Sequence, residues 1–573
     1  MQNSMFQKAQ TCLSINKIHG KIRWQIAFFL LAFPVLLMAQ PTKPAKKGEI
    51  ETEEIVIEKS RAITLPEAER NFEKVTTLAK KPENAAQKYE ATDRNLKLAD
   101  LNTKFRILQM TQEPAKESTG NYLKAALGNY MGIYGDAFFG SKRNDAFSWN
   151  ARGKFLSFGK GPVNGNNSAT QESLLSGNVK FIADALTASA GLEFKRDLYH
   201  FYGSGVKRDR KDIRQVFSTI ALKTAFANNK TDSPLDYKLN LNVFNTKDAY
   251  NASEFEFNVN LDGKYRISDA LSILTPSETY FTRLQDSGSV SRNLFRSKPQ
   301  LQFSKDAFTV TAGLNIATQN DTTAAISKIN IYPIFEAQVT IGKAFTVFGG
   351  FTGDVQRNYF RQIVGDNPFV NNRLQVFNAS KISDLYGGIK RQLGGALSFD
   401  VRTSIAKYRN LYFFTNSLRD TTRFDLTYET GTTGVFNLST EVAYDAGKKF
   451  RIAAKADFYK YTLKNLQQPW HRPTFTATVM GRFAATESLF FTTEIYYLGG
   501  IQAPKYVRNG NVVTEKAVQL DPIADVNLKT EYIFLEKFSA YLSLNNLLSS
   551  RYQRFQYYQN RGATAILGAT FSF

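Results

Sequence analysis

The stretch FEFNVNLDGKYRI, Phe255–Ile267, alternates apolar and polar residues over most of its length. Successive side chains of a β-strand point to opposite faces, so this period of two predicts a strand with two different faces. The apolar face carries Phe255, Phe257, Val259, Leu261, Tyr265 and Ile267. The polar face carries Glu256, Asn258, Asn260, Asp262, Lys264 and Arg266. We predict that the first face contacts lipid and the second faces water.

The same alternation continues through the chain from Asn121 onward. In LDYKLNLNVF, Leu235–Phe244, apolar residues at every second position oppose Asp, Lys and Asn. Long strands with one charged face are typical of a transmembrane barrel, whose interior is polar, whereas strands of soluble sandwiches are usually shorter. The sequence therefore predicts an all-β protein, with a transmembrane antiparallel β-barrel over residues 121–573.

The connections between these segments are alternately short and long. Short turns are expected near residues 268–269, 305–306, 342–343, 393–394, 446–448, 486–487 and 535–537, and long loops near 159–172, 200–214, 285–293, 357–383, 462–471 and 500–518. Bacterial outer-membrane barrels have tight periplasmic turns and longer external loops. A first count gives about 23 strands, and merging 422–445 into one long strand gives about 22, the even number that such barrels have. Both termini then lie in the periplasm.

The last residues, ILGATFSF (Ile566–Phe573), keep the same pattern to the final side chain. Leu567, Phe571 and Phe573 share one face, and mostly small or polar residues share the other. Chain ends usually fray unless neighbouring structure holds them. An edge strand of a soluble sheet and the closing strand of a barrel both explain this ending, and the alternation elsewhere favours the barrel.

The N-terminal residues have the pattern of an export signal. Basic residues precede the apolar run Ile26–Met38, and Ala39 supplies a small residue before a cleavage point. A transmembrane helix needs about 20 apolar residues, which this run does not reach. We predict that residues 1–39 are a cleaved signal peptide. The one cysteine, Cys12, lies upstream of the apolar run, so the mature chain has none.

Residues 40–120 differ in composition from the rest of the chain. They are rich in Lys, Glu, Ala and Pro, as in LAKKPENAAQKYEATDRN (Leu78–Asn95), and poor in aromatic residues. Segments of low hydrophobicity and high charge do not bury enough apolar surface to fold. We predict a flexible periplasmic arm over residues 40–120.

The composition leaves few residues for catalysis or metal binding. The chain has three histidines, of which His200 and His471 belong to the mature part. Both lie in aromatic segments that we expect at the outer membrane interface. The sequence predicts no catalytic residue, no metal ligand and no cofactor, so the protein is not expected to be an enzyme. Calcium sites built from loop carboxylates are left open.

The chain is basic, and its charge bears on the choice of partners. The formal charge is +22, and residues 1–39 carry four basic and no acidic residues, so the mature chain has a charge of +18. Nucleic acid is not expected as a partner of an exported barrel. Basic loops such as VKRDRKDIR (Val206–Arg214) either contact lipopolysaccharide phosphates or form an ordinary solvated surface.

A barrel of about 22 strands behind a signal peptide resembles the TonB-dependent receptors of Gram-negative outer membranes. The ending SLNNLLSSRYQRFQYYQNRGATAILGATFSF (Ser543–Phe573) is similar to that family's ending, with an Asn-Leu pair, Arg-Tyr, and then Gly and a final aromatic residue. Over residues 121–542 the resemblance is architectural.

The resemblance assigns a role to three residues near the C-terminus. Gly568, Phe571 and Phe573 match the signal that the barrel-assembly machinery recognises, and the resemblance implies this machinery as a partner. Ile566 departs from the pattern, because a polar residue is usual there. The alternative is that Phe573 only fills an aromatic girdle.

A second fragment supports the resemblance. EEIVIEKS (Glu53–Ser60) is similar to a TonB box, the extended segment that pairs with a strand of TonB by β-addition. The pairing residues would be Glu54, Ile55, Val56 and Ile57. A β-branched run in an ordinary charged linker has the same composition and is the alternative.

The segment between Ser60 and Asn121 departs from the family. The receptors carry a folded plug domain there, whereas this segment lacks the length and the glycine-rich strand pattern of a plug. A barrel of this size without a plug is an open pore unless something else fills it. Receptor-like barrels without a full plug are expected in the Bacteroidetes, where related barrels also serve in larger envelope assemblies.

Two functions follow from these observations. The first is a TonB-dependent-receptor-like transport protein that moves an unidentified solute across the outer membrane. The second is a non-transporting structural or assembly subunit of an outer-membrane protein complex. Expected partners are outer-membrane lipid and lipopolysaccharide, the barrel-assembly machinery, TonB for the first function and other complex subunits for the second.

Overall fold

The computed structural model describes residues 120–573 except 142–145, 231, 287, 322, 324–326, 343, 392–395, 510 and 511. The predicted signal peptide (1–39), nearly all of the predicted arm (40–120) and its TonB-box-like segment lie outside these residues.

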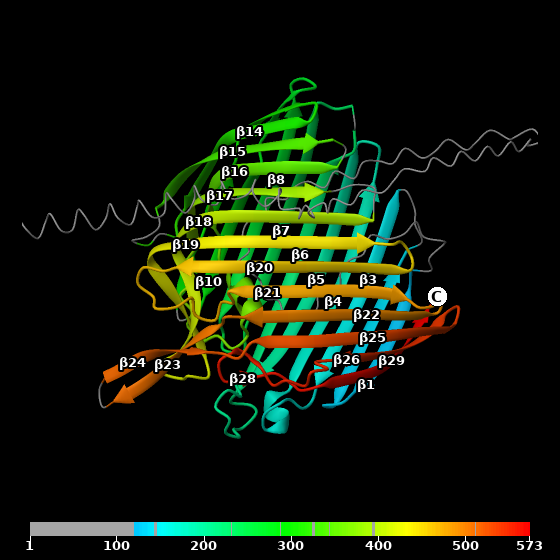
Figure 1. Cartoon of the computed structure of the whole chain (residues 1–573), viewed down its shortest axis with the longest axis vertical. Coiled ribbons are helices and arrows are strands. Elements are labelled where there is room, and N and C mark those ends of the chain that lie inside the picture. The colour runs from blue at the N-terminus through cyan, green and yellow to red at the C-terminus, as the bar shows by residue number, and fades with distance from the viewer. Residues whose placement is uncertain are drawn as a thin grey trace, which may run out of the picture. The chain divides into compact units, whose positions relative to one another are not determined.

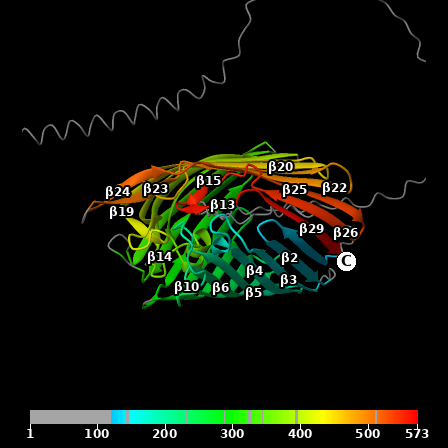
Figure 2. The same ribbon diagram turned by 90° about the horizontal axis from the view of Figure 1, so that it is seen from below.

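The described strands form a closed antiparallel barrel of 22 strands, seen from the side in Figure 1 and turned by a right angle in Figure 2. Each strand pairs with its neighbours in the chain, and β1 (Tyr122–Gly128) pairs with β29 (Thr564–Ser572) to close the ring. Closure removes the unpaired sheet edges that a membrane does not tolerate. The predicted all-β class and strand number are confirmed.

Most strands of the ring run without interruption. They are β1, β2 (Gly132–Gly140), β3 (Phe147–Phe158), β4 (Thr170–Ile182), β5 (Leu186–His200), β6 (Arg214–Asn228), β7 (Leu235–Lys247), β8 (Ser253–Arg266), β14 (Phe308–Gln319), β15 (Ile329–Ile341), β16 (Phe345–Gln356), β17 (Ala379–Arg391), β18 (Leu397–Asn416), β19 (Phe424–Asp445), β20 (Phe450–Thr462), β21 (Phe475–Ala484), β22 (Leu489–Gly499), β25 (Ile523–Leu535), β26 (Phe538–Asn545) and β29.

Two further strands of the ring are broken near a proline, because proline has no N–H to donate to the ladder. Pro276 separates β9 (Leu271–Leu274) from β10 (Ser277–Gln285), and Pro299 separates β12 (Leu294–Ser297) from β13 (Gln300–Lys305). The remaining elements lie in connections: η1 (Gly165–Ser168), β11 (Ser289–Ser291), α2 (Phe360–Asp366), β23 (Gln502–Asn509), β24 (Val512–Gln519), β27 (Gln553–Phe555) and β28 (Tyr558–Gln559). In the described part, no helix is long and apolar enough to cross a membrane.

The two ends of the barrel differ, as the sequence predicts. Short connections such as 446–449 and 536–537 gather at one end, which we call the turn end, and the long loops gather at the other, the loop end. The single strand β19, Phe424–Asp445, covers all but the first two of residues 422–445, which confirms the merged strand. Both ends of the ring lie at the turn end, where the N–H of Phe573 donates to the carbonyl oxygen of Asn121 at 3.1 Å.

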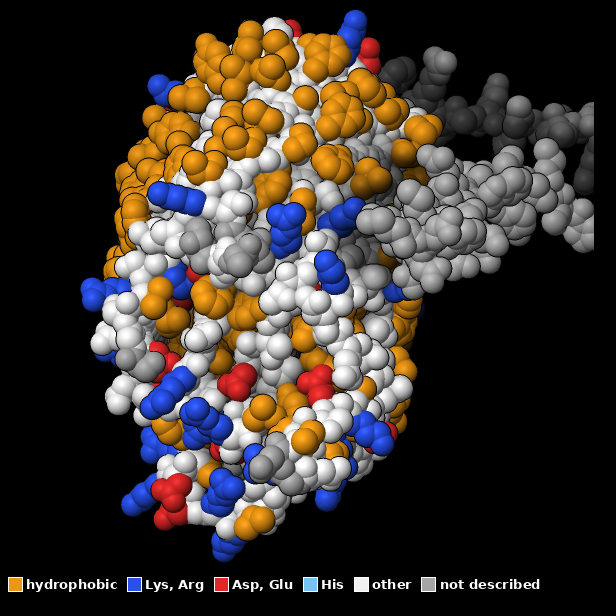
Figure 3. All heavy atoms as spheres, turned by 90° about the vertical axis from the view of Figure 1, so that its left-hand side faces the viewer, with side chains coloured by type: hydrophobic (Ala, Val, Ile, Leu, Met, Phe, Trp, Pro, Cys, Tyr) orange, Lys and Arg blue, Asp and Glu red, His pale blue; other side chains and the backbone are white. Residues whose placement is uncertain are grey.

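The outer surface of the barrel is apolar, and the interior is polar. On β8, Phe255 is 47% exposed and Tyr265 is 48% exposed, whereas the intervening Glu256 and Asn258 are buried on the inner side. The predicted faces of this strand are confirmed. In Figure 3, apolar side chains are dense over the upper part of the visible surface, and charged side chains gather over its lower part. An outward apolar belt on a closed barrel is the surface that a lipid bilayer covers.

The C-terminal phenylalanines lie in an aromatic group at the turn end. The rings of Phe571 and Phe573 stack with centroids 5.2 Å apart, Phe538 lies 4.7 Å from Phe571, and Phe139 lies 6.1 Å from Phe573. Aromatic girdles mark the membrane interfaces of such barrels. Phe573 is therefore placed as a girdle residue, and its recognition by the assembly machinery stays a prediction.

Gly568 lies where the ring closes. A Cβ atom at this position would meet the Cβ of Ala126 at 2.5 Å and the backbone oxygen of Ala125 at 2.6 Å, both on β1, and the ring of Tyr541 on β26 at 2.7 Å. No side chain fits these separations, so glycine lets three strands approach at the seam.

Candidate functional site at the outer mouth

The loop between β16 and β17, residues 357–378, turns into the mouth of the barrel and contains α2. Phe360, Ile363 and Val364 are spaced three and four residues apart, so they share one helix face, and all three are buried. The N–H of Phe360 donates to the Glu254 carboxylate of β8 at 2.9 Å. An apolar face and a charge-assisted hydrogen bond therefore fix the helix to the wall.

Two arginines on either side of the start of α2 add contacts to the wall. Arg357 donates to the Glu256 carboxylate at 2.6 Å, and its guanidinium lies 4.3 Å from the Tyr280 ring centroid. The Arg361 guanidinium lies 3.5 Å from the centroid of Phe244. These partners lie on β8, β10 and β7, so the loop is bound to three neighbouring strands.

The far part of the same loop reaches β19. Val370 forms a parallel bridge with Phe424, the N–H of Asn371 donates to the Phe424 carbonyl at 2.7 Å, and the N–H of Phe424 donates to the Phe369 carbonyl at 3.0 Å. Strands β9 to β18 separate β8 from β19 along the chain. Residues 357–378 therefore connect two distant parts of the wall.

The loop before the last strand, residues 546–563, meets this crossing segment. The Tyr558 ring stacks on Phe369 with centroids 3.5 Å apart and meets the Tyr202 ring edge-on at 4.9 Å. The Tyr558 hydroxyl donates to the carbonyl oxygen of Thr422. Loops from four connections thus converge in the mouth.

A fifth loop, residues 463–474, is held by one buried carboxylate. Glu429 Oε2 accepts hydrogen bonds from the backbone N–H groups of Lys464, Asn465 and Leu466 at 3.2, 2.9 and 2.9 Å. The Glu429 residue is 0% exposed. Several backbone donors on one carboxylate compensate for its lost hydration.

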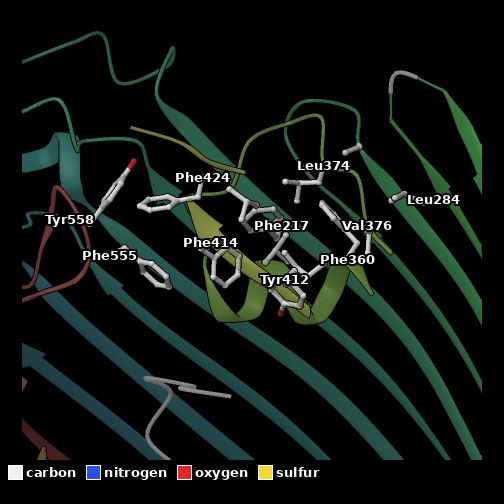
Figure 4. Close-up of a cluster of buried hydrophobic side chains, with 14 residues drawn as sticks. Phe217, Leu284, Phe360, Leu374, Val376, Tyr412, Phe414, Phe424, Phe555 and Tyr558 are labelled. Carbon is white, nitrogen blue, oxygen red and sulfur yellow. The ribbon is translucent and has the colours of Figure 1, made fainter. Parts of the chain in front are cut away.

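We call these five loops the cap: residues 201–213, 357–378, 417–423, 463–474 and 546–563. Buried apolar side chains join much of the cap to the inner faces of the strands around it, as Figure 4 shows. This core consists of Phe217, Ala252, Leu284, Phe360, Ile363, Val364, Val370, Leu374, Val376, Tyr412, Phe414, Phe424, Phe555 and Tyr558. Each large side chain buried here contributes about 1.5–3 kcal/mol, so the cap is a packed part of the protein.

Both mature-chain histidines are buried in the mouth, not at the outer membrane interface where we expected them. Arg210 Nε donates to His200 Nε2 at 3.1 Å, and His200 Nδ1 donates to the Ala169 carbonyl at 2.8 Å. His471 Nδ1 donates to the Phe414 carbonyl at 2.7 Å, and burial lowers the pKa of His471 to about 3. The aromatic neighbours of these histidines indicated a membrane girdle, but they pack inward around the cap.

Behind α2 the inner wall carries buried ion pairs. Arg292 contacts Asp321 at 2.7 Å and donates to the carbonyl oxygen of Asn358 in the cap at 3.0 Å. Arg296 contacts Asp354 at 2.7 Å. Removing one partner of such a pair leaves an uncompensated buried charge. The polar inner wall therefore also contacts and supports residues 357–378, through the hydrogen bond from Arg292 to Asn358.

A small cavity of about 30 Å³ lies among these loops. Aromatic side chains of β18 and β20 line it, together with His471 and the charged residues Asp366, Arg472 and Arg554. Within the described residues, no group of three or more His, Cys, Asp or Glu side chains is placed to hold a metal ion.

The residues that the sequence singled out lie elsewhere. Glu54, Ile55, Val56 and Ile57 fall outside the described residues. Gly568 and Phe571 lie on β29, and Phe573 follows it directly, so the two phenylalanines lie at the turn end. The expected long loops near 357–383 and 462–471 do carry cap residues, but no sequence signal indicated which of their side chains would meet.

The closed ring, the outward apolar belt, the short turns at one end and the folded loops at the other define a large outer-membrane barrel. Barrels of this strand number occur as outer-membrane transporters. The turn end then faces the periplasm, and the cap lies at the external mouth.

Comparison with solved structures identifies known barrels that have a similar fold. The chain is similar to the siderophore receptor PirA from Acinetobacter baumannii, with a TM-score of 0.59, 10% sequence identity, and coverage of 79% of this chain and 80% of that one. It is similar to the FrpB iron transporter from Neisseria meningitidis, with a TM-score of 0.60, 10% identity, and coverage of 79% and 81%. The ferric enterobactin receptor PfeA from Pseudomonas aeruginosa gives a TM-score of 0.57, 12% identity, and coverage of 79% and 81%.

No protein-family model and no curated protein matches the sequence. Identities of 10–12% establish the shared fold and no more. The fold is that of a TonB-dependent-receptor-like barrel of the cell outer membrane.

Proposed function

We propose that this protein transports a solute across the outer membrane in the manner of a TonB-dependent receptor. The cap carries this proposal. It joins distant strands of the wall across the external mouth, so a solute that enters at this end meets these loops first. Barrels of the same fold include siderophore receptors and an iron transporter, which makes a metal chelate a reasonable first solute to test.

Energy for the movement would come from the periplasm. The segment Glu54–Ile57 precedes the barrel, and both ends of the ring lie at the turn end. An extended β-prone segment on that side pairs with a partner's strand through backbone hydrogen bonds. We assign this role to TonB, and insertion to the barrel-assembly machinery through Gly568, Phe571 and Phe573. We assign no catalytic role to the protein.

A second function is favoured by the packing of the cap. Every buried residue of its core is at most 8% exposed, and a structural or assembly subunit would have no need to open it. The hairpin β23–β24 projects from the barrel in Figure 1 and exposes Val512 at 65%. Such a hairpin offers a contact surface to another subunit of an outer-membrane complex.

The experiment that separates the two functions replaces Ile55 and Ile57 with proline, which removes two backbone donors and prevents strand addition. The matched control replaces Lys59 and Arg61, which lie just beyond the segment. Both variants are expressed in a strain that lacks its own copy and are supplied with ferric siderophores as the only iron source. Transport predicts that growth is lost in the first variant and kept in the control.

Normal growth of the first variant on every solute that depends on the wild-type protein would contradict coupling to TonB. Deleting residues 60–120 provides the complementary measurement. If that deletion admits large antibiotics while the proline variant behaves as wild type, the arm fills the barrel and the structural function is supported.

A further inference from the structure

The cavity beside His471 has a charge pattern that the cap's packing does not explain. Two of the side chains that line it are guanidinium groups, Arg472 and Arg554, and one is a carboxylate, Asp366. His471 is neutral, because burial lowers its pKa to about 3. The lining groups therefore carry one more positive than negative charge, inside a mouth built mainly of aromatic side chains.

Each arginine is fixed by a backbone acceptor. Arg472 donates from one terminal nitrogen to the Tyr412 carbonyl at 2.7 Å, and its guanidinium lies 5.1 Å from the Phe413 ring centroid. Arg554 donates from one terminal nitrogen to the His471 carbonyl at 2.6 Å. A neutral carbonyl acceptor holds a guanidinium in position but does not balance its charge.

Both arginines also have an unused donor. The Nε atoms of Arg472 and Arg554 are shielded from solvent, and neither has a hydrogen-bond partner among the described residues. A buried N–H without an acceptor is costly, and it is more costly on a charged group. Burial lowers the pKa of Arg554 to about 10 although Asp366 opposes the shift. Asp366 is thus the one carboxylate beside two guanidinium groups in this lining, and it leaves both Nε donors without an acceptor.

We propose that this cavity binds an oxyanion, a carboxylate or phosphate group, between Arg472 and Arg554. A guanidinium presents its N–H groups in a planar fork that matches the oxygens of either group. The volume of about 30 Å³ accommodates a few heavy atoms, so the site takes one anionic group of a larger molecule or a small free anion. This inference rests on the proposed function and assigns its substrate class: an anionic solute, recognised beneath the cap.

The binding experiment does not depend on transport. The purified mature chain carries Trp149 and Trp470. Replacing Trp149 with Phe leaves Trp470, which is buried next to His471, as the reporter. Tryptophan fluorescence is followed in detergent while inorganic phosphate or citrate is added. We expect a saturable change that Arg472→Gln and Arg554→Gln each weaken about ten- to hundred-fold, because each removes one charged donor.

Arg561→Gln is the matched control. Arg561 belongs to the same loop as Arg554 and is likewise half-buried. It lies over the Phe158 ring and donates to Thr170 Oγ1, and it does not line the cavity. The affinity should not change in this variant. Loss of heat-modifiable mobility would identify variants that do not fold, and for these Arg472→Lys and Arg554→Lys keep a charge while removing the fork and should still weaken binding.

Lipopolysaccharide phosphates have the same chemistry as a free anion. The titration is therefore repeated with phosphatidylcholine vesicles that contain or lack lipopolysaccharide. A change that depends on both arginines and appears only with lipopolysaccharide supports the site and identifies a lipid-borne group. The absence of a saturable change with any probe, or equal weakening by Arg561→Gln, would overturn the proposal. Normal growth of the proline variant, together with anion binding that still depends on both arginines, would refute only the coupling to TonB.

Discussion

At the scale of single residues, neighbours in one strand meet different solvents. Val259 and Asn260 follow one another in β8 and point to opposite faces of the barrel wall. Val259 lies opposite Leu241 and Thr279 on the lipid side, and Asn260 lies opposite Glu278 on the inner side. The same added charge should therefore have different effects at the two positions.

We expect Val259→Arg to destabilise the barrel by about 2–4 kcal/mol, because a cation near the middle of the bilayer loses its hydration. Asn260→Arg faces the polar interior near a carboxylate and should be tolerated. Urea unfolding in lipid vesicles measures both free energies. Equal losses at these adjacent positions would show that the faces are assigned wrongly.

Gly568 tests how closely the seam is packed. Gly568→Ala places a Cβ within 2.5 Å of Ala126, and the strain of such overpacking is about 1–3 kcal/mol. Gly135→Ala on β2 is the matched control, because a Cβ there meets nothing within 4 Å. The fraction of heat-modifiable, closed barrel should fall in the first variant and stay unchanged in the second. If both variants form the closed barrel equally well, the seam accommodates a Cβ atom at residue 568, and the close packing inferred there is wrong.

At the scale of elements, the sequence predicted the barrel well and the cap poorly. The period of two shows in long strands such as β7 and β8, because lipid and water act on each strand locally. The length of β19 followed from parity, since a barrel with both termini on one side requires an even number of strands. No comparable pattern within a single segment predicts how the loops of the cap pack. Glu429 holds residues 463–474 by accepting hydrogen bonds from backbone N–H groups. Nearly every residue has such a group, so the amino-acid sequence does not indicate which ones Glu429 binds.

The loop 463–474 should respond to pH through His471. The pKa of this histidine is lowered by burial from 6.5 to about 3. The unfolded or released loop therefore binds a proton at a higher pH than the packed loop does. The stability that the neutral ring contributes is present above about pH 6.5 and is lost as the pH falls toward 3. Arg472, Arg554 and Asp366 face the same cavity, and the Arg554 charge also lowers the pKa of His471, so it opposes protonation of the ring.

We expect Trp470 fluorescence to report release of this loop as the pH falls below 6.5. His471→Asn should remove most of the transition, because the amide does not titrate and still donates toward the Phe414 carbonyl. Asparagine also tolerates the left-handed backbone of this residue, whose φ is 56°. His200→Gln, the other buried histidine, is the control and should keep the transition. A transition unchanged in His471→Asn would mean that another group releases the loop.

At the scale of the whole molecule, the cap joins segments that lie far apart in the chain. Phe217 and Tyr558 belong to one apolar core, although more than half of the chain separates them. No pattern in either segment predicts the other as its partner. The sequence therefore predicts the barrel but not the packing of the cap. A transporter and a structural barrel differ in whether the cap opens.

A reversible disulfide crosslink within the cap tests which of these functions is correct. Val370 and Phe424 form a parallel bridge. Neighbouring strands lie about 4.7–4.9 Å apart, which is within the Cα separation that disulfides span. The described residues include no cysteine, so Val370→Cys with Phe424→Cys forms a single crosslink between the loop 357–378 and β19. The reduced form of the same variant is the control, because it has lost the same side chains.

If the cap moves during transport, oxidation should abolish solute-dependent growth, and a reductant that enters the envelope should restore it. The energetic reason is that the crosslink removes every state in which residues 357–378 leave β19, whatever force acts from the periplasm. Gel mobility without reductant measures how much crosslink has formed. A fully crosslinked barrel that supports growth as well as its reduced form would show that solute does not pass through this mouth, and it would favour the structural subunit.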